Sequence, residues 1–189
     1  MRVLNHGAPR GAEGAGGKVR RGGRGMTSRL CREKKNVFYY KDRGVYTDEN
    51  IDWVVYSLMD HNVPPDITIN SNKKIGLFHG PIVGLTTDIG YKFEDGFDTH
   101  RFMGCDLVLW GDIHKRQIFD IPGQKKAYMV GSTIQQNFGE TVRKHGFGIY
   151  DVDNDKYEFV DLHNPKPFLS FKIKSYDDLT KGTEKLVNH

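Results

Sequence analysis

The sequence predicts an α/β fold, with α+β as the alternative, in which helices are few. Most apolar runs are short and rich in β-branched and aromatic residues, which is typical of buried strands. Only residues 94–103 and 177–187 have the spacing of short helices. The predicted strands are 36–40, 51–58, 73–79, 105–110, 126–130, 147–152, 157–162 and 168–173.

The composition excludes two classes of protein. Of 189 residues, 37% are hydrophobic, which is enough for one core, but no uncharged apolar stretch approaches the ~18 residues of a membrane span. The two cysteines, Cys31 and Cys105, lack metal-motif spacing and are too few for a disulfide scaffold. We therefore expect a protein without a membrane partner, cytoplasmic or associated with a nucleoid or nucleus, and not secreted.

Residues 1–35 differ from the rest of the chain in charge and composition. They hold 10 Lys and Arg against 2 Asp and Glu, a net charge of +8, and eight of the first 25 residues are glycine. Residues 36–189 hold 18 against 22, a net charge of −4. A Gly-rich segment without apolar periodicity cannot offset its ordering entropy, so we expect a disordered basic tail. A basic arm that contacts phosphates is one alternative, and a translation start at Met26 is another.

Polar side chains follow three predicted strands at the point where each strand ends. His79 closes the first of these runs, and Asp112 and His114 follow the second. Ser132 follows the third. In open α/β sheets, ligands and metals collect outside the carboxyl ends of the strands. Because Asp112 and His114 are two residues apart, an extended segment would present both side chains to one pocket.

Two imidazoles and one carboxylate at a sheet edge are donors for a divalent cation. Imidazole suits Mn, Fe, Co and Zn, and a carboxylate favours the harder members of this series. We therefore expect His79, Asp112 and His114 to be metal ligands. Two other interpretations stay open: His79 as a histidine satisfied within the core or in a turn, and the Asp112–His114 segment as a capped turn.

The motifs around these residues resemble a known family. They are Leu77-Phe-His79-Gly80, Gly111-Asp-Ile-His-Lys-Arg-Gln117 and Val130-Gly-Ser-Thr-Ile-Gln-Gln-Asn-Phe-Gly-Glu140. In order and spacing, they are similar to the second half of a calcineurin-like metallophosphoesterase domain. Within that superfamily they are most similar to the Mre11/SbcD DNA-repair nucleases, including phage recombination nuclease subunits. The family has Gly-His-X-His where this chain has Asp112 in place of the first histidine.

The resemblance implies a partial two-sheet metallophosphoesterase sandwich with a metal site. His79, Asp112 and His114 would hold Mn²⁺, with Mg²⁺ or Fe²⁺ as alternatives, in a site that contains two metals in the complete family. Ser132 would shape the loop beside the site and belong to the substrate-binding residues. The residues near the substrate phosphates would be Lys115 and Arg116, and those fixing the imidazoles would be Thr86, Thr87 or Asp88.

The first-half motifs of the family do not occur in residues 1–76: Asp-X-His, Gly-Asp-X-X-Asp and Gly-Asn-His-Asp/Glu are all missing. The resemblance therefore implies the C-terminal half of a nuclease domain over 36–166. The start of a capping, DNA-binding domain would follow at 167–189. The catalytic residues that the family carries in its first half are not identified in this chain.

The resemblance implies metal-dependent hydrolysis of phosphodiester bonds in DNA, by an exo- or endonuclease subunit of DNA repair and recombination. Such subunits act with a coiled-coil ATPase of the Rad50/SbcC type, usually as homodimers. Because the first-half motifs are missing, we expect little activity from this chain alone. The alternatives are another metallophosphoesterase or phosphatase, and a non-catalytic fragment.

Overall fold

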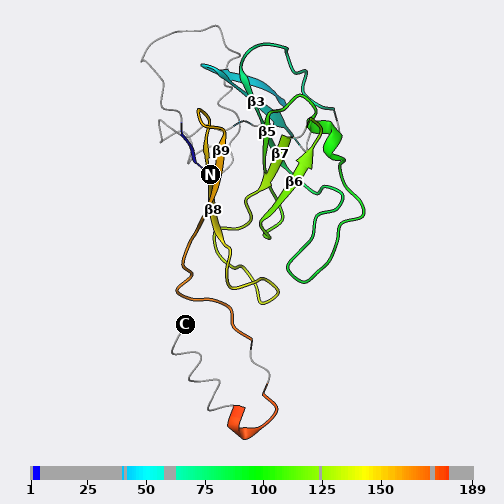
Figure 1. Cartoon of the computed structure of the whole chain (residues 1–189). Coiled ribbons are helices and arrows are strands. Elements are labelled where there is room, and N and C mark those ends of the chain that lie inside the picture. Colours follow the sequence, from blue (N-terminus) through cyan, green and yellow to red (C-terminus); the bar gives the residue numbers. More distant parts are fainter. Residues whose placement is uncertain are drawn as a thin grey trace.

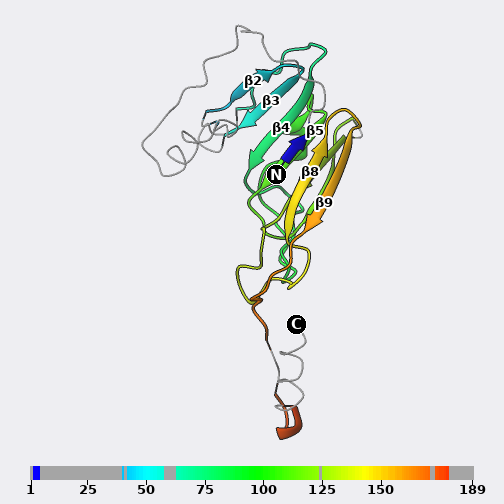
Figure 2. The same cartoon turned by 90° about the vertical axis from the view of Figure 1, so that its left-hand side faces the viewer.

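The fold is rich in strands and poor in helix. The computed structural model describes residues 2–4, 40, 42–57, 63–123, 125–170 and 173–178. In these residues nine strands form two sheets that lie face to face (Figures 1 and 2). The prediction of a strand-dominated chain with few helices is confirmed. No helix in the described ranges is long and apolar enough to cross a membrane.

Six strands form the larger sheet: β2 (Gly44–Asp48), β3 (Ile51–Tyr56), β4 (Lys73–His79), β5 (Leu107–Gly111), β6 (Gln117–Ile121) and β7 (Lys125–Met129). Their order is β2-β3-β4-β5-β7-β6. The four central strands are parallel, and β2 and β6 pair antiparallel at the edges. Because parallel strands end on the same side, β4, β5 and β7 bring the residues that follow them to one end of the sheet.

The smaller sheet consists of β1 (Arg2–Leu4), β8 (Gly146–Asp151) and β9 (Lys156–Asp161). β8 and β9 form the predicted antiparallel hairpin, and β1 pairs in parallel with β8. The strand β1 corrects the prediction that the tail is wholly disordered. Its backbone pairs with groups along the otherwise open edge of β8. The rest of the predicted tail lies outside the described residues.

The two sheets pack together through a shared apolar core. This arrangement suits parallel strands, which are normally covered on both faces. Figure 2 shows β8 and β9 as a second layer beside β4 and β5, with β4 and β9 ending at the same end of the sandwich. The buried side chains between the layers are Ile51, Ile75, Leu107, Leu109, Tyr150 and Val152.

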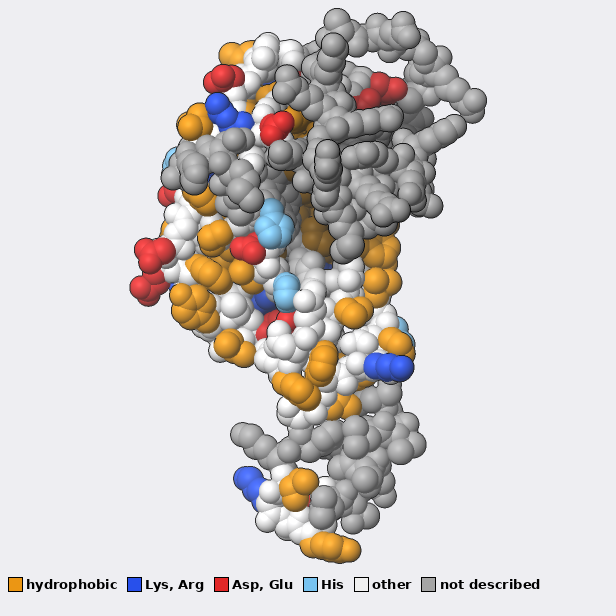
Figure 3. Space-filling view, turned by 180° about the vertical axis from the view of Figure 1, so that it is seen from behind, with side chains coloured by type: hydrophobic (Ala, Val, Ile, Leu, Met, Phe, Trp, Pro, Cys, Tyr) orange, Lys and Arg blue, Asp and Glu red, His pale blue; other side chains and the backbone are white. Residues whose placement is uncertain are grey.

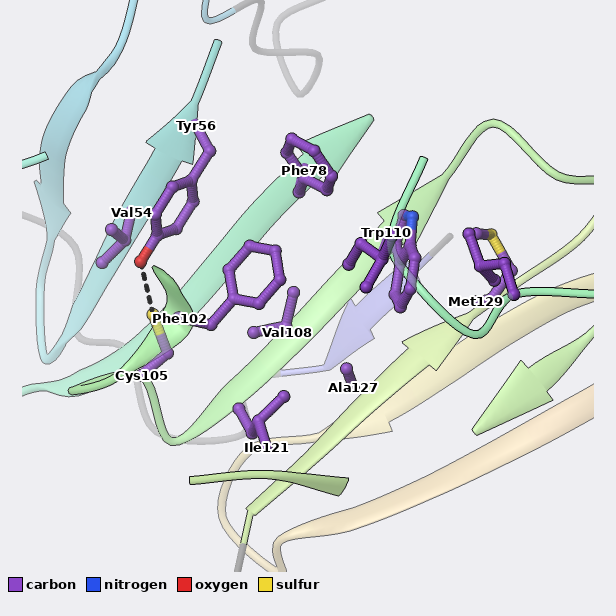
Figure 4. Packing of buried hydrophobic residues seen from close by; sticks show 12 residues of the cluster. Val54, Tyr56, Phe78, Phe102, Cys105, Val108, Trp110, Ile121, Ala127 and Met129 are labelled. Carbon is purple, nitrogen blue, oxygen red and sulfur yellow. Dashed lines mark hydrogen bonds between the residues drawn. The ribbon is translucent and has the colours of Figure 1, made fainter. Parts of the chain in front are cut away.

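The other face of the larger sheet is covered by the segment 81–105. Ile82, Leu85 and Phe102 of this segment are fully buried against the sheet. Figure 4 shows Phe102 between the strand residues of this core, with a hydrogen bond joining Tyr56 Oη and Cys105 Sγ. Burial raises the pKa of the Cys105 thiol to about 11, so this cysteine is a protonated core residue.

Several predicted strands are confirmed and others need correction. β4 has the predicted bounds, and β3, β5, β7, β8 and β9 lie within two residues of theirs. The edge strands β2 and β6 were not predicted. β2 is short and begins at a glycine, and glycine at that position favours a turn. β6 has the alternation of exposed and less exposed side chains that is typical of a strand, and this pattern was missed when the strands were predicted from the sequence. The predicted strand 36–40 lies outside the described residues except for Tyr40, which is not in a strand.

The predicted helix 94–103 is wrong. Only Thr99–Phe102 forms a 3₁₀ turn, η2, which begins where the carboxylate of Asp98 accepts a hydrogen bond from the His100 amide. Gly96 has φ of +144° and a Cβ there would lie 3.0 Å from the Pro81 carbonyl oxygen, so the chain before η2 cannot be helical.

The predicted elements at the C-terminal end are also altered. Residues 168–170 and 173 are not in a strand, because the backbone of Phe168 pairs with the side chain of Gln135 rather than with another strand. Of the predicted helix 177–187, residues 177 and 178 are helical together with residue 176, and the remainder lies outside the described residues.

Candidate functional site

The imidazole of His79 lies at the carboxyl end of β4, beside β5. His79 is the last residue of its strand and pairs in register with Gly111. A Cβ added at Gly111 would lie 3.2 Å from Cδ2 and 3.9 Å from Nε2 of the His79 ring. The His79 residue is exposed, which argues against the interpretation as a core histidine. Glycine at position 111 therefore leaves room for this ring next to the turn that carries Asp112 and His114.

Asp112 occupies a strained backbone conformation. Its φ is +112°, a region that L-residues rarely adopt, and its side chain is exposed. The segment from Asp112 to His114 is therefore not extended, and the expected alternation that would point both side chains the same way does not apply. The chain instead turns sharply as it leaves β5.

A buried carboxylate orients the imidazole of His114. Nδ1 of His114 and Oε1 of Glu140 are 2.7 Å apart, and the Glu140 side chain is 7% exposed. Burial by itself would raise the pKa of Glu140, but hydrogen bonds from His114 Nδ1 and the Gln136 amide lower it below its ordinary value. An ionised carboxylate only accepts hydrogen bonds, so the neutral His114 imidazole carries its proton on Nδ1 and keeps the lone pair on Nε2. Metal-binding histidines are commonly oriented in this way.

Two residues of the loop that carries Glu140 also donate hydrogen bonds to its carboxylate. The Gln136 amide donates to Oε2 at 2.8 Å, and Nδ2 of Asn137 donates to Oε1 at 2.6 Å. With His114, three donors thus converge on one carboxylate. Such a carboxylate has little freedom to rotate, so the His114 ring is held by a preorganised acceptor.

Ser132 faces the protein interior. Its residue is 8% exposed, and Oγ lies 2.9 Å from Nδ1 of His145. Nε2 of His145 lies 2.7 Å from the Thr141 carbonyl oxygen, which can only accept. His145 is therefore protonated on Nε2 when neutral, and Ser132 donates to Nδ1. The Ser132 amide also donates to the His114 carbonyl oxygen at 3.1 Å, so Ser132 supports the predicted site through backbone contact.

The two basic residues predicted near phosphates have different surroundings. Nζ of Lys115 donates to Oγ1 of Thr86 at 3.0 Å. Arg116 donates through Nη1 to Asp161 at 2.5 Å and stacks on Phe159 of β9, with its guanidinium carbon 4.4 Å from the ring centre. Arg116 thereby ties the turn after β5 to the smaller sheet, while Lys115 stays beside the loop 81–105.

The two threonines predicted to fix the imidazoles have other partners. The amide and the hydroxyl of Thr86 both donate to Oε1 of Gln117 at 3.0 Å. The hydroxyl of Thr87 accepts from the Tyr91 amide at 3.2 Å. These threonines organise the loop 81–105, and the orienting carboxylate of His114 is Glu140. Glu140, His145 and Gln135 were not assigned roles from the sequence, because nothing in the spacing of 26 residues indicates that Glu140 reaches His114.

The predicted donors come from the carboxyl ends of two neighbouring parallel strands but do not complete a metal cage. Figure 3 shows two histidine side chains in the middle of one face, with acidic side chains next to them and hydrophobic side chains around them. Within the ranges that the structure describes, no group of three His, Cys, Asp or Glu side chains is arranged to hold a metal ion. Taken alone, His79, Asp112 and His114 do not form the coordination shell that the resemblance implies.

Comparisons with known proteins found one viral relative. No protein-family model matches the chain, and no solved structure matches it. The chain is 30% identical over 149 residues to an uncharacterized protein of Acanthamoeba polyphaga mimivirus. The match covers 73% of this chain and 11% of the viral protein, so the chain spans about a ninth of the length of that relative.

Proposed function

We propose that the chain contributes to a metal-dependent phosphodiesterase of the Mre11/SbcD type that hydrolyses DNA. The observation that carries this proposal is the imidazole of His114, which a buried Glu140 orients at the same sheet end as His79. An imidazole whose Nδ1–H donates to a carboxylate and whose Nε2 has a free lone pair is the form that binds divalent metals.

In this proposal His79, Asp112 and His114 bind Mn²⁺, with Mg²⁺ or Fe²⁺ as alternatives. Because these three side chains do not complete a site, a bound metal would need further ligands. The proposed sandwich of two sheets over 36–166 is a partial metallophosphoesterase domain, and residues from 167 onward begin a capping domain. DNA, a coiled-coil ATPase of the Rad50/SbcC type and a second copy of the chain are the proposed partners.

The experiment is calorimetric titration of the full chain with Mn²⁺, beside the His114→Ala variant. We expect the wild-type chain to take up Mn²⁺ and the His114→Ala variant not to. No uptake, or uptake unchanged in the variant, would contradict the proposal. A matched control is His163→Ala, which removes an exposed imidazole from the segment after β9 and should leave uptake unchanged.

A second candidate is a metallophosphoesterase that acts on small phosphodiesters or phosphoproteins. The net charge of −4 over residues 36–189 favours it, because an acidic surface disfavours DNA. A panel of single-stranded DNA, double-stranded DNA, cyclic nucleotides and p-nitrophenyl esters separates the two. Hydrolysis confined to the small esters would replace the DNA nuclease with this candidate.

A further inference from the structure

Gln135 is a buried polar side chain at the centre of the loop that carries Glu140. The residue is 2% exposed, and its amide group makes three hydrogen bonds. Nε2 donates to the Glu140 carbonyl oxygen at 3.0 Å and to the Phe168 carbonyl oxygen at 3.1 Å. Oε1 accepts from the Phe168 amide at 2.8 Å. Both amide protons are used, so the group has one well-defined orientation.

The partner of Gln135 lies 33 residues later in the chain. Phe168 belongs to the segment 165–170, which runs away from both sheets after β9 (Figure 1). The side chain of Gln135 pairs with the backbone of Phe168 in the way that one strand pairs with another. The rings of Phe138 and Phe168 also contact each other, with centres 5.0 Å apart. The segment 165–170 is therefore fastened to the loop 135–140 at two points.

We propose that Gln135 is a positioning residue that couples the segment 165–170 to His114 through Glu140. This inference rests on the proposed function, in which His114 is a metal ligand. The contacts run from the Phe168 backbone to the Gln135 amide, from that amide to the Glu140 backbone, and from the Glu140 carboxylate to Nδ1 of His114. When Phe168 moves away, the buried amide of Gln135 loses two of its three bonds and has to reorient.

Reorientation of Gln135 removes the donor that holds the Glu140 backbone. The Glu140 backbone can then shift and carry its carboxylate, still bound to Gln136 and Asn137, away from His114, whose Nδ1 loses the partner that keeps its proton. A neutral imidazole that protonates Nε2 instead cannot use that nitrogen to bind a metal. The position of the segment 165–170 thereby sets how well His114 binds a cation.

The test measures which His114 nitrogen carries the proton, by nitrogen-15 NMR of the metal-free full chain at about pH 8, above the ordinary histidine pKa. The signals of His114 are identified by their loss in His114→Gln. Wild type is expected to show the Nδ1–H form, and Gln135→Met is expected to move the ring toward Nε2–H. The matched control is Gln136→Ala, because Gln136 is exposed and contributes its backbone amide to Glu140, which alanine retains.

A second pair of variants tests the coupling from the other side. Phe168→Pro removes the amide that donates to Gln135 and is expected to act on His114 as Gln135→Met does. Phe168→Ala removes the ring contact with Phe138 but keeps both backbone bonds, and is expected to leave the His114 proton in place. The Kd for Mn²⁺ is expected to rise about tenfold in Gln135→Met and Phe168→Pro, the lower end of the range for outer-shell partners.

An unchanged His114 proton position in folded Gln135→Met and Phe168→Pro would overturn the coupling. If near-UV circular dichroism shows that Gln135→Met does not fold, Gln135→Glu takes its place, because it keeps the acceptor for Phe168 and removes both donors. The two proposals can fail separately. If the chain takes up no Mn²⁺ but the His114 proton still moves in the variants, the proposed function is refuted and the positioning role of Gln135 is supported.

Discussion

The two ends of the parallel strands in the larger sheet carry polar clusters of different kinds. At the amino end, Asp52 is 1% exposed and accepts hydrogen bonds from Thr47, Asn70 and Asn72 at 2.8–2.9 Å. Nζ of Lys74 donates to the carbonyl and side-chain oxygens of Asn70 and to the Asn72 carbonyl, at 2.9–3.2 Å. All three protons of this ammonium group are used. The amino-end cluster is therefore closed on itself and stabilises the fold.

At the carboxyl end the polar side chains are more exposed and have fewer partners within the protein. His79 and Asp112 are exposed, and the His114 side chain is 40% exposed with one ring nitrogen held by Glu140. Asp112 also keeps a strained backbone that glycine would relieve. The difference shows that burial of charge does not mark the candidate site in this protein. The candidate site is marked instead by exposed side chains that can bind a metal, one of which, His114, is held in a fixed orientation by Glu140.

The largest effect is expected from breaking the closed cluster. Asp52→Ala removes the buried acceptor of three partly exposed donors and should lower the free energy of unfolding by about 2–3 kcal/mol, measured by urea denaturation. Mn²⁺ uptake by the folded fraction should not change. Asp48→Ala is the control, because Asp48 is exposed on β2 and its loss should change stability by about 0.5 kcal/mol or less. Equal effects of the two substitutions would contradict a closed structural cluster.

A smaller loss of unfolding free energy is expected at Gly131, where the backbone lies in close contact with His114 at the carboxyl end of the sheet. Gly131 has φ of +79°, and a Cβ there would lie 2.5 Å from the His114 carbonyl oxygen. Gly131→Ala should cost about 1–3 kcal/mol of unfolding free energy and weaken Mn²⁺ uptake, because the turn around His114 has to move. Gly123→Ala is a matched control, with φ of +85° and nothing within 4 Å of the added Cβ. Similar losses in both variants would show that backbone strain alone, and not the collision, limits position 131.

The strands of the sandwich follow from the sequence, and much of the site does not. β4 was predicted with its observed bounds because a buried parallel strand is a continuous apolar run that ends abruptly at His79. The predicted helix over 94–103 failed at Gly96, whose backbone conformation is set by contact with Pro81. That contact is tertiary and leaves no local signal.

The same distinction applies to the candidate site. That His79, Asp112, His114 and Ser132 follow parallel neighbouring strands could be inferred from the sequence. Their partners could not, because Glu140 reaches His114 from a loop after β7 whose path depends on packing. The sequence shows that Asp112 stands where the resembling family has the first histidine of its Gly-His-X-His motif, but it does not show that Asp112 has a positive φ.

The pH dependence of stability tests the role of the Glu140 carboxylate at the carboxyl end of the sheet. The pKa of Glu140 lies below its ordinary value of about 4.3, so its stabilising contribution is complete above that pH and is lost as the pH falls through the folded-state pKa. Glu140→Gln should therefore be less stable than wild type at neutral pH, and the two should converge as the pH falls through the lowered pKa of Glu140. The Kd for Mn²⁺ should rise about 10–100-fold at neutral pH. A stability difference that persists unchanged in acid would assign the effect to packing and not to the carboxylate.

The smallest expected effect has the opposite sign. Asp112→Gly removes the strain of φ at +112° and should raise the free energy of unfolding by about 0.5–1 kcal/mol while it weakens Mn²⁺ uptake. Glu49→Gly is the control: Glu49 has φ of +53° in the β2–β3 turn, at the other end of the larger sheet, and its replacement should not alter Mn²⁺ uptake. A variant that gains stability and loses the metal would show that Asp112 is strained because its side chain serves the candidate site at the carboxyl end of the sheet. Loss of stability in Asp112→Gly would instead mean that the Asp112 side chain stabilises the turn, as in the capped-turn interpretation.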